Sequence, residues 1–410
     1  MTPELLQDRM PITVLQSAYP QLFDFITAHY PQAIKDKETL HFCGVACPEK
    51  NRSYVFLPRG STNKHSISDA RLTMNALARY GQDVESRIGN NATEGGDTNL
   101  AATIRNIVTD YQRNGLYSQR LRIRSRNTGK PDWKRTLQRR IPLLDRKGRP
   151  VYSDLDCTRF LSAPENLLAT VQALTLRQIL SAHGWWTSLD QSLLAETADI
   201  RTPNLAEVQI APAIRRFKHL LFDDRSLALA SLLEQYWDSR ATETEGTFIC
   251  GVPDFSAIWE HMLKAALKDV SATWNARLPL PAYRYSDGNT HPRSSGGVMD
   301  IVVEQDGRIV VADAKYYRAT STATAPGFGD ILKQSFYSQS LKKLAPKHTV
   351  ESYFVFPSWE DIGPLQMGAF YNRDPVDRTD WLEPVNCIYV NVRSIMSDYT
   401  ARRKTDWLPL

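Results

Sequence analysis

The clearest strand pattern of the chain lies between residues 296 and 317, in its last third. Two runs rich in Val and Ile, residues 299–304 and 308–315, flank the dipeptide Asp306-Gly307. Such runs are typical of β-strands, and glycine supplies the positive φ that a type I′ turn requires. The pattern therefore predicts a β-hairpin at this place.

Helical spacing of apolar residues flanks the hairpin on both sides. Residues 255–267 place their apolar side chains on one stripe, with Glu260 next to it. Residues 330–337 predict a second helix, on which Gln334 and Tyr337 share a face because they are three positions apart. We therefore expect a helix before the hairpin and another after it.

Further apolar runs predict strands at residues 351–356 and 386–392. With residues 282–285 as the first strand, the order of elements becomes αβββαβ. Small and polar residues at 242–251 predict a domain boundary. We therefore expect a C-terminal α/β domain over residues 246–410.

The first 245 residues show a mixed pattern. Residues 1–38 predict mostly helix, and residues 41–57 predict a hairpin. Further helices are expected at residues 67–88, 98–116, 164–182, 204–222 and 225–238. This predicts an N-terminal mixed α+β region over residues 1–245, with room for two subdomains.

Composition narrows the class of protein. The 410 residues are 42% hydrophobic and 23% charged, which is ordinary for a globular protein. No run approaches the roughly 20 apolar residues of a membrane-spanning helix. The start of the chain lacks a basic, apolar signal segment, and the five cysteines are odd in number and scattered. These features predict a cytoplasmic protein.

One cysteine pair offers a metal hypothesis. His41, Cys43 and Cys47 are three zinc-ligand types in one short stretch, but no second ligand pair lies nearby. Alternation instead favours a strand with both cysteines on a buried face. A structural role is therefore the preferred interpretation.

Positive charge is concentrated in one segment. Residues 112–150 hold thirteen Lys and Arg against two Asp, an excess of eleven, whereas the whole chain carries only +5. The remainder is therefore negative by about six charges. This asymmetry predicts a polyanionic partner or an acidic protein surface.

Within this segment, arginines alternate with other residues at the spacing of a strand. One face would carry Arg120, Arg122, Arg124 and Arg126. A solvated edge strand protected by charge would look the same. We favour contact with nucleic acid, extended by Lys130, Lys134 and Arg135. Trp133, beside Lys134, could stack on a base, although packing against the protein is the preferred interpretation.

The hairpin turn determines which residues face each other. If Asp306 and Gly307 form the turn, Asp300 lies directly opposite Asp313, and Lys315 shares the face of Asp313. Opposed carboxylates repel unless a cation lies between them, and Mg²⁺ is usually held by one or two carboxylates together with phosphate oxygens. Lys315 would then orient or deprotonate a water, or offset charge on the phosphate.

Asp300 followed by Asp313-Ala314-Lys315 resembles the PD-(D/E)XK nuclease signature, without its proline. Gln334 and Tyr337 resemble the Gln-x-x-Tyr helix of the RecB-like branch, and the set resembles most closely the nuclease subunit of McrC/LlaJI-type restriction systems. The segment 129–137 is similar to a Gly-Lys-x-x-Trp-Lys-x-Thr segment of the LlaJI-like family.

The resemblance implies a restriction-endonuclease-like αβββαβ core and a Mg²⁺-dependent DNA endonuclease of a restriction or antiviral defence system, with Mn²⁺ as the alternative ion. Asp300, Asp313 and the Ala314 carbonyl would hold the metal, and Glu260 would either complete a second metal site or be an ordinary surface residue. Gln334 would steady a metal-bound water or the phosphate. The chain has no P-loop sequence, so the resemblance also implies an AAA+ GTPase or ATPase partner.

Two other functions fit the same residues. The chain could be a non-catalytic subunit that binds DNA or activates the motor, or an effector that cleaves RNA. The intact Asp300, Asp313 and Lys315 favour an active nuclease. For a double-strand break in DNA, two active sites are the simplest arrangement, so a dimer or larger assembly is expected.

Overall fold

The computed structural model describes residues 3–409 except residues 36, 50–51, 61–64, 89–97, 119–120, 162–165, 241–246, 361–362, 373–378 and 380. The chain divides into two compact units: Ala102–Thr244, and a larger unit that combines Thr2–Ala101 with Glu245–Leu410. The sequence-based division grouped residues 1–245 together, whereas by contacts the first hundred residues belong with the C-terminal part. Within the described residues, no helix has the length and apolarity needed to cross a lipid bilayer.

A four-stranded sheet in the order β1-β5-β4-β11 forms the N-terminal part of the larger unit. Its strands are β1 (Glu4–Gln7), β4 (Cys43–Glu49), β5 (Arg52–Leu57) and β11 (Phe248–Val252). Helices α1 (Ile12–Ala18) and α2 (Pro20–His29), the 3-10 helix η1 (Pro31–Ala33) and the short strands β2 (Met10–Pro11) and β3 (Thr39–Leu40) accompany it. The helical prediction for the start of the chain was wrong at β1, because this short strand is stabilised by parallel pairing with β5. The strand predicted around Cys43 and Cys47 is present, and Cys43 is buried in it, whereas Cys47 is only half-buried.

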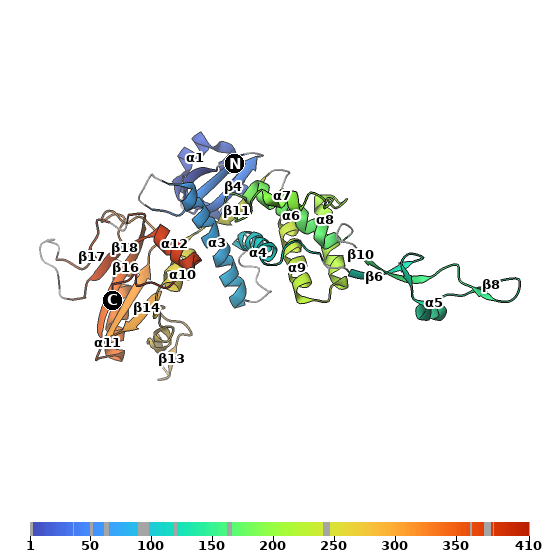
Figure 1. Ribbon diagram of the computed structural model, residues 1–410. Coiled ribbons are helices and arrows are strands. Elements are labelled where there is room, and N and C mark those ends of the chain that lie inside the picture. Colours follow the sequence, from blue (N-terminus) through green and yellow to red (C-terminus); the bar gives the residue numbers. More distant parts are fainter. Residues whose placement is uncertain are drawn as a thin grey trace. The chain divides into compact units, whose positions relative to one another are not determined.

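The C-terminal part contains a five-stranded sheet in the order β14-β15-β16-β18-β17 (Figure 1). Its strands are β14 (Ile301–Gln305), β15 (Arg308–Ala314), β16 (Thr349–Ser358), β17 (Met367–Gly368) and β18 (Val385–Asn391). β14 and β15 are antiparallel, whereas β15, β16 and β18 run parallel. Parallel neighbours need a crossover, which helix α11 (Phe328–Leu344) supplies between β15 and β16.

Helices cover this sheet. Tyr337 and Leu341 of α11 pack in one core with Ile309 and Val311. Because side chains alternate along a strand, Asp313 of β15 points to the same face of the sheet as Ile309 and Val311. Helices α10 (Ser256–Ala266) and α12 (Val392–Thr400) pack against each other and against strands of the sheet, and α3 (Ile67–Ile88) packs on both helices. Residues 67–88 from the N-terminal part of the chain therefore pack directly on the C-terminal helices.

The prediction that residues 282–285 form the first strand of the sheet was wrong. β12 (Ala282–Arg284) pairs only with β13 (Thr290–Pro292), in a separate two-stranded hairpin. Its side chains are exposed, and the Asp287-Gly288 turn, with φ +86° at Gly288, returns the chain on itself. Tyr283 and Tyr285 are both more than half exposed, so this hairpin does not bury a face against the main sheet. The 3-10 helix η4 (Trp274–Arg277) precedes it.

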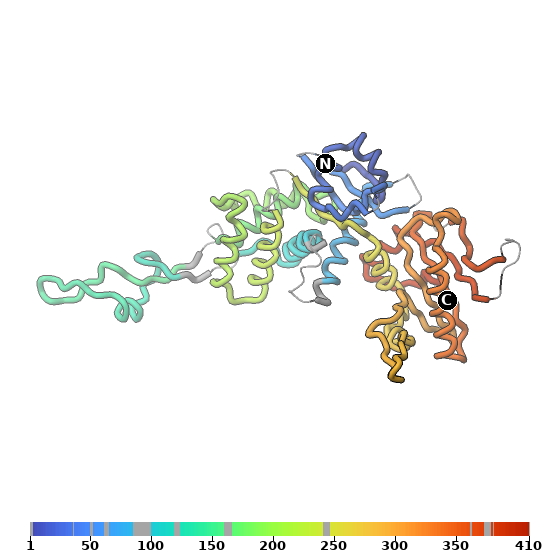
Figure 2. Tube along the Cα trace, turned by 180° about the vertical axis from the view of Figure 1, so that it is seen from behind, coloured from blue at the N-terminus to red at the C-terminus, as the bar shows by residue number. Residues whose placement is uncertain are grey.

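The smaller unit consists of helices and an extended ribbon, whose sheet has the strand order β6-β10-β7 (Figure 2). The helices are α4 (Thr98–Asn114, mainly in this unit), α6 (Leu167–His183), α7 (Ser192–Glu196), α8 (Glu207–Phe217), the 3-10 helix η3 (Lys218–Leu220) and α9 (Asp224–Arg240). The ribbon pairs β6 (Leu121–Arg126) with β10 (Asp156–Leu161) and carries β7 (Lys130–Pro131), α5 (Trp133–Arg139), β8 (Leu143–Leu144) and β9 (Pro150–Val151). We call residues 121–161 the arm.

Candidate active site

The β14–β15 hairpin brings Asp300 and Asp313 together. Residues 301–305 pair with residues 308–312. This confirms the register that the two-residue turn predicted. Both turn residues have positive φ, 49° and 77°, as a type I′ turn requires. Asp300 stands one residue before β14, and its Oδ2 accepts a hydrogen bond from Ala314 N at 3.0 Å. This bond holds the Asp300 carboxylate against the end of β15.

Asp313 is buried and lies between two lysines. Lys315 Nζ is 2.7 Å from Asp313 Oδ2, and Lys333 Nζ is 3.2 Å from Asp313 Oδ1. Lys315 Nζ also lies 2.6 Å from Asp330 Oδ1, at the start of α11. The side chain of Asp313 is only 4% exposed, so these charges offset each other with little screening by water.

The two carboxylates differ in their electrostatics. Burial raises the pKa of Asp300 to about 6, and the negative charges of Asp313 and Glu260 act in the same direction. Burial also opposes ionisation of Asp313, but the hydrogen bond and charge of Lys315, together with Lys333, hold its pKa below the usual value. Burial likewise opposes charging of Lys315, yet Asp313 and Asp330 raise its pKa and so favour the ammonium form. The site therefore holds one firmly ionised carboxylate beside one that ionises reluctantly.

Helix α11 presents polar residues to this site. Gln334 is 1% exposed, and neither atom of its amide has a hydrogen-bond partner among the residues that the structure describes. Tyr337 donates a hydrogen bond to Val298 O at 2.9 Å, and its ring lies against Gly297, where a Cβ would come within 2.8 Å. Leaving a buried amide unpaired costs free energy, so Gln334 is a candidate for hydrogen bonding to a further group.

Glu260 lies on α10 and forms an ion pair with Lys264. Its charge contributes to the raised pKa of Asp300, so the two carboxylates are close enough to interact. In the described part of the chain, no group of three or more His, Cys, Asp or Glu side chains is arranged to hold a metal ion. The donor set nevertheless suits Mg²⁺, which is commonly bound by one or two carboxylates plus waters and substrate oxygens.

Sequence reasoning missed two residues of this site, Asp330 and Lys333. Asp330 forms an ion pair with Lys315, and Lys333 forms one with Asp313. The spacing offered a signal, since Lys333 lies three positions after Asp330 and four before Tyr337 on a predicted helix. Only the crossover packing of α11 shows that this face meets β15.

All the predicted basic residues except Arg120 belong to the arm, which is far from these carboxylates in sequence. Arg120 falls outside the described residues, and Arg122 is placed only through its backbone pairing with Phe160. The remaining predicted residues are exposed except Arg135, which is half-buried: Arg124, Arg126, Lys130, Lys134 and Arg135. Arg126 forms an ion pair with Asp154, so part of the positive charge is offset within the arm.

Apolar side chains of the arm are also exposed. Trp133 is 55% exposed, so the interpretation that it packs against the protein was wrong; α5 is too short and isolated to build a core around it. The other exposed apolar residues are Leu137, Ile141, Leu143, Leu144 and Val151, with Ile141 at 93%. Such a cluster is typical of a surface that binds a partner.

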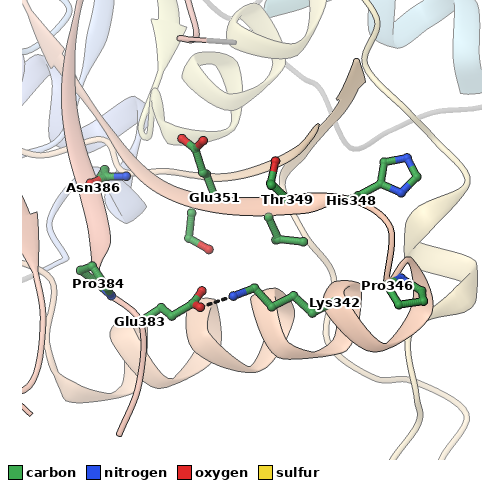
Figure 3. Close-up of a pocket in the computed structure, with 10 residues that line it drawn as sticks. Lys342, Pro346, His348, Thr349, Glu351, Glu383, Pro384 and Asn386 are labelled. Atoms are coloured by element: carbon green, nitrogen blue, oxygen red, sulfur yellow. Dashed lines mark hydrogen bonds and ion pairs between the residues drawn. The ribbon is translucent and has the colours of Figure 1, made fainter. Parts of the chain in front are cut away.

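A groove of about 700 Å³ lies elsewhere on the same sheet, at the starts of β16 and β18 (Figure 3). Thr349, Glu351 and Asn386 line it, and the ion pair between Lys342 and Glu383 lies at its edge. Asp313 lies near the opposite end of β15, so this groove contains none of the predicted site residues.

The mixed α/β fold is consistent with a restriction endonuclease. The family model described as LlaJI restriction endonuclease matches residues 45–365, which cover most of the chain and include every candidate site residue. The chain belongs to the LlaJI restriction endonuclease family, and membership implies a nuclease that hydrolyses DNA. No curated protein matches the chain.

Proposed function

We propose that this protein is the metal-dependent endonuclease of a restriction or antiviral defence system, with a PD-(D/E)XK-type site that cleaves double-stranded DNA. One observation carries the proposal: Asp300 and Asp313 face each other across a buried hairpin end, and Lys315 bridges Asp313 to Asp330. Stability alone does not favour opposed carboxylates in a sheet.

Asp300, Asp313 and the Ala314 carbonyl would hold Mg²⁺ or Mn²⁺, with Glu260 as a further oxygen ligand. A bound divalent ion offsets charge on the phosphoryl oxygens and lowers the pKa of its bound water. The Lys315 ammonium would donate a hydrogen bond to the attacking water. Gln334 would bind the water or a phosphate oxygen with its unpaired amide.

Plasmid cleavage tests this proposal. The full chain is incubated with supercoiled DNA and Mg²⁺, with and without an AAA+ partner, alongside Lys315→Ala, Asp313→Ala and an EDTA control. We expect cleavage by wild type and at least about a 100-fold loss in both variants. Wild-type rates in Asp313→Ala would refute the site assignment.

Two alternatives predict other results of the same experiment. A non-catalytic subunit would bind DNA or the motor tightly without cleavage under any condition. An RNA-cleaving effector would degrade RNA and leave the plasmid intact. The paired carboxylates and Lys315 favour the DNA nuclease over the first alternative, because a subunit without catalysis has no need of them.

We further propose that the arm binds partners of the nuclease. Its exposed basic residues suit DNA phosphates, whereas its exposed apolar residues suit a protein surface. An AAA+ GTPase or ATPase is the protein partner we propose, on the basis of the resemblance to McrC/LlaJI-type restriction systems; the chain has no P-loop sequence of its own. The two roles use different side chains of the same arm and can be separated by mutation.

A further inference from the structure

Helix α11 brings a second lysine to the carboxylate that we propose as a metal ligand. Lys333 lies 3.2 Å from Asp313 Oδ1, while Lys315 lies 2.7 Å from Oδ2 of the same group. Each oxygen of Asp313 therefore faces an ammonium group. Lys315 is shared with Asp330, and Asp300 lies beside Asp313, so Lys333 supplies positive charge to a site that holds three carboxylates.

The two lysines are held differently. The side chain of Lys315 is 16% exposed, and it is also bound by Asp330. The side chain of Lys333 is 41% exposed, and its ammonium lies 5.7 Å from the centre of the Tyr337 ring as well as near Asp313. Lys333 is thus the more accessible of the two, on a long and flexible stem.

A divalent ion and Lys333 compete for the same carboxylate. A metal bound at Asp313 needs lone pairs of its oxygens, and its double positive charge repels an ammonium group a few ångströms away. Lys315 keeps a second carboxylate in Asp330 when this happens. Lys333 has an ion pair with Asp313 but none with Asp330, and a phosphodiester entering with the metal would offer its ammonium group a negative oxygen.

We propose that Lys333 is a second catalytic cation, which pairs with Asp313 in the metal-free protein and with a non-bridging oxygen of the scissile phosphodiester when metal and DNA are bound. This inference rests on the proposed nuclease function. In the metal-free protein Lys333 shields Asp313 from repulsion by Asp300. With DNA bound, it offsets the charge that develops on the phosphoryl oxygens during hydrolysis.

Two measurements on the full-length protein test this role. The variants are Lys333→Gln, which removes the charge at similar length, and Lys333→Arg, which keeps it. Lys343→Gln is the matched control, because Lys343 is an exposed lysine on the same helix. Mn²⁺ affinity is measured without DNA, by the paramagnetic resonance signal of the free ion. Single-turnover cleavage of DNA is measured separately, and thermal unfolding checks that all variants fold.

We expect Lys333→Gln to bind Mn²⁺ roughly threefold to tenfold more tightly than wild type, since a competing cation is gone. Its cleavage rate should nevertheless fall about 100-fold or more, with Lys333→Arg in between and Lys343→Gln unchanged. Mn²⁺ affinity that is equal to or weaker than wild type would show that Lys333 only supports Asp313, and would overturn the inference.

The outcomes also separate this inference from the proposed function. If wild type and Lys343→Gln cleave DNA and Lys333→Gln cleaves equally well, only the role of Lys333 is refuted. If wild type neither binds Mn²⁺ nor cleaves DNA, the nuclease proposal fails and the role of Lys333 fails with it.

Discussion

The hydroxyl of Tyr316 donates a hydrogen bond to Asp8 Oδ2 at 2.8 Å, in the interior of the larger unit. Tyr316 directly follows Lys315, and Asp8 directly follows β1. The Tyr316 oxygen also accepts a bond from Arg59 N at 2.7 Å, while Asp8 Oδ1 accepts one from Phe42 N at 3.0 Å. The N-terminal sheet is thereby connected to the residue beside the proposed catalytic lysine.

Removing this connection should affect both stability and cleavage. Asp8→Ala leaves two buried donors without their acceptor, so we expect the free energy of unfolding to fall by about 2–3 kcal/mol, and by about 1 kcal/mol in Tyr316→Phe. Urea unfolding measures both values. The cleavage rate should fall as well, because the backbone at Lys315 loses support. Asp24→Ala, at an exposed position of α2, is the control. Unchanged unfolding in Asp8→Ala would show that the bond contributes nothing.

Metal binding should weaken in acid, because Asp300 must lose its proton to act as a ligand. Burial, with Asp313 and Glu260, raises the pKa of Asp300 to about 6, so affinity should be nearly constant above pH 6 and fall up to about tenfold per pH unit below it. Glu260→Gln removes one of these causes and should move the fall to lower pH. Mn²⁺ titrations between about pH 5 and 8 measure this, with Glu383→Gln as a control at the separate groove. Affinity that is independent of pH would contradict Asp300 as a ligand.

The Gln334 amide should lower the stability of the fold while supporting cleavage. Its buried amide has no partner among the described residues, so Gln334→Met should raise the free energy of unfolding by about 1–2 kcal/mol while the cleavage rate falls. Ser335→Ala on the same helix is the comparison, since this hydroxyl is also buried without a described partner. We expect it to stabilise the protein without loss of cleavage. Full cleavage by Gln334→Met would rule out a catalytic role for the amide.

The two proposed roles of the arm predict that different substitutions weaken binding to DNA and binding to the AAA+ partner. Arg124→Gln and Lys134→Gln should each reduce the slope of log affinity for DNA against log salt by about 1, since each removes one phosphate contact. Ile141→Ser should leave DNA affinity unchanged and weaken binding to the AAA+ partner, because its side chain is 93% exposed and apolar. Fluorescence anisotropy at about 50–200 mM salt measures the slopes. Equal slopes in all variants would exclude the arm from DNA contact.

Local sequence was sufficient to predict the elements that carry the carboxylates. The β14–β15 register follows from the two-residue turn, and the span of α3 matches its prediction at both ends. The strand nature of β6 also followed from its alternation. In each case the determining interactions lie within a few residues along the chain, where backbone preference and side-chain periodicity act directly.

Only the tertiary structure decided what surrounds those elements. β11 pairs with β4, although the residues of the smaller unit separate the two strands in sequence. Asp8 accepts a hydrogen bond from Tyr316, which lies 308 positions further along the chain. The crossover of α11 brings Lys333 into contact with Asp313. β12 was expected in the main sheet but pairs with β13 instead. Such pairings depend on which distant surface is available to bury a side chain or satisfy a backbone group, and that depends on packing of the whole chain rather than on any local pattern. The sequence by itself determined that Asp300 and Asp313 face each other. The packing of the whole chain decided which lysines and which amide lie beside them.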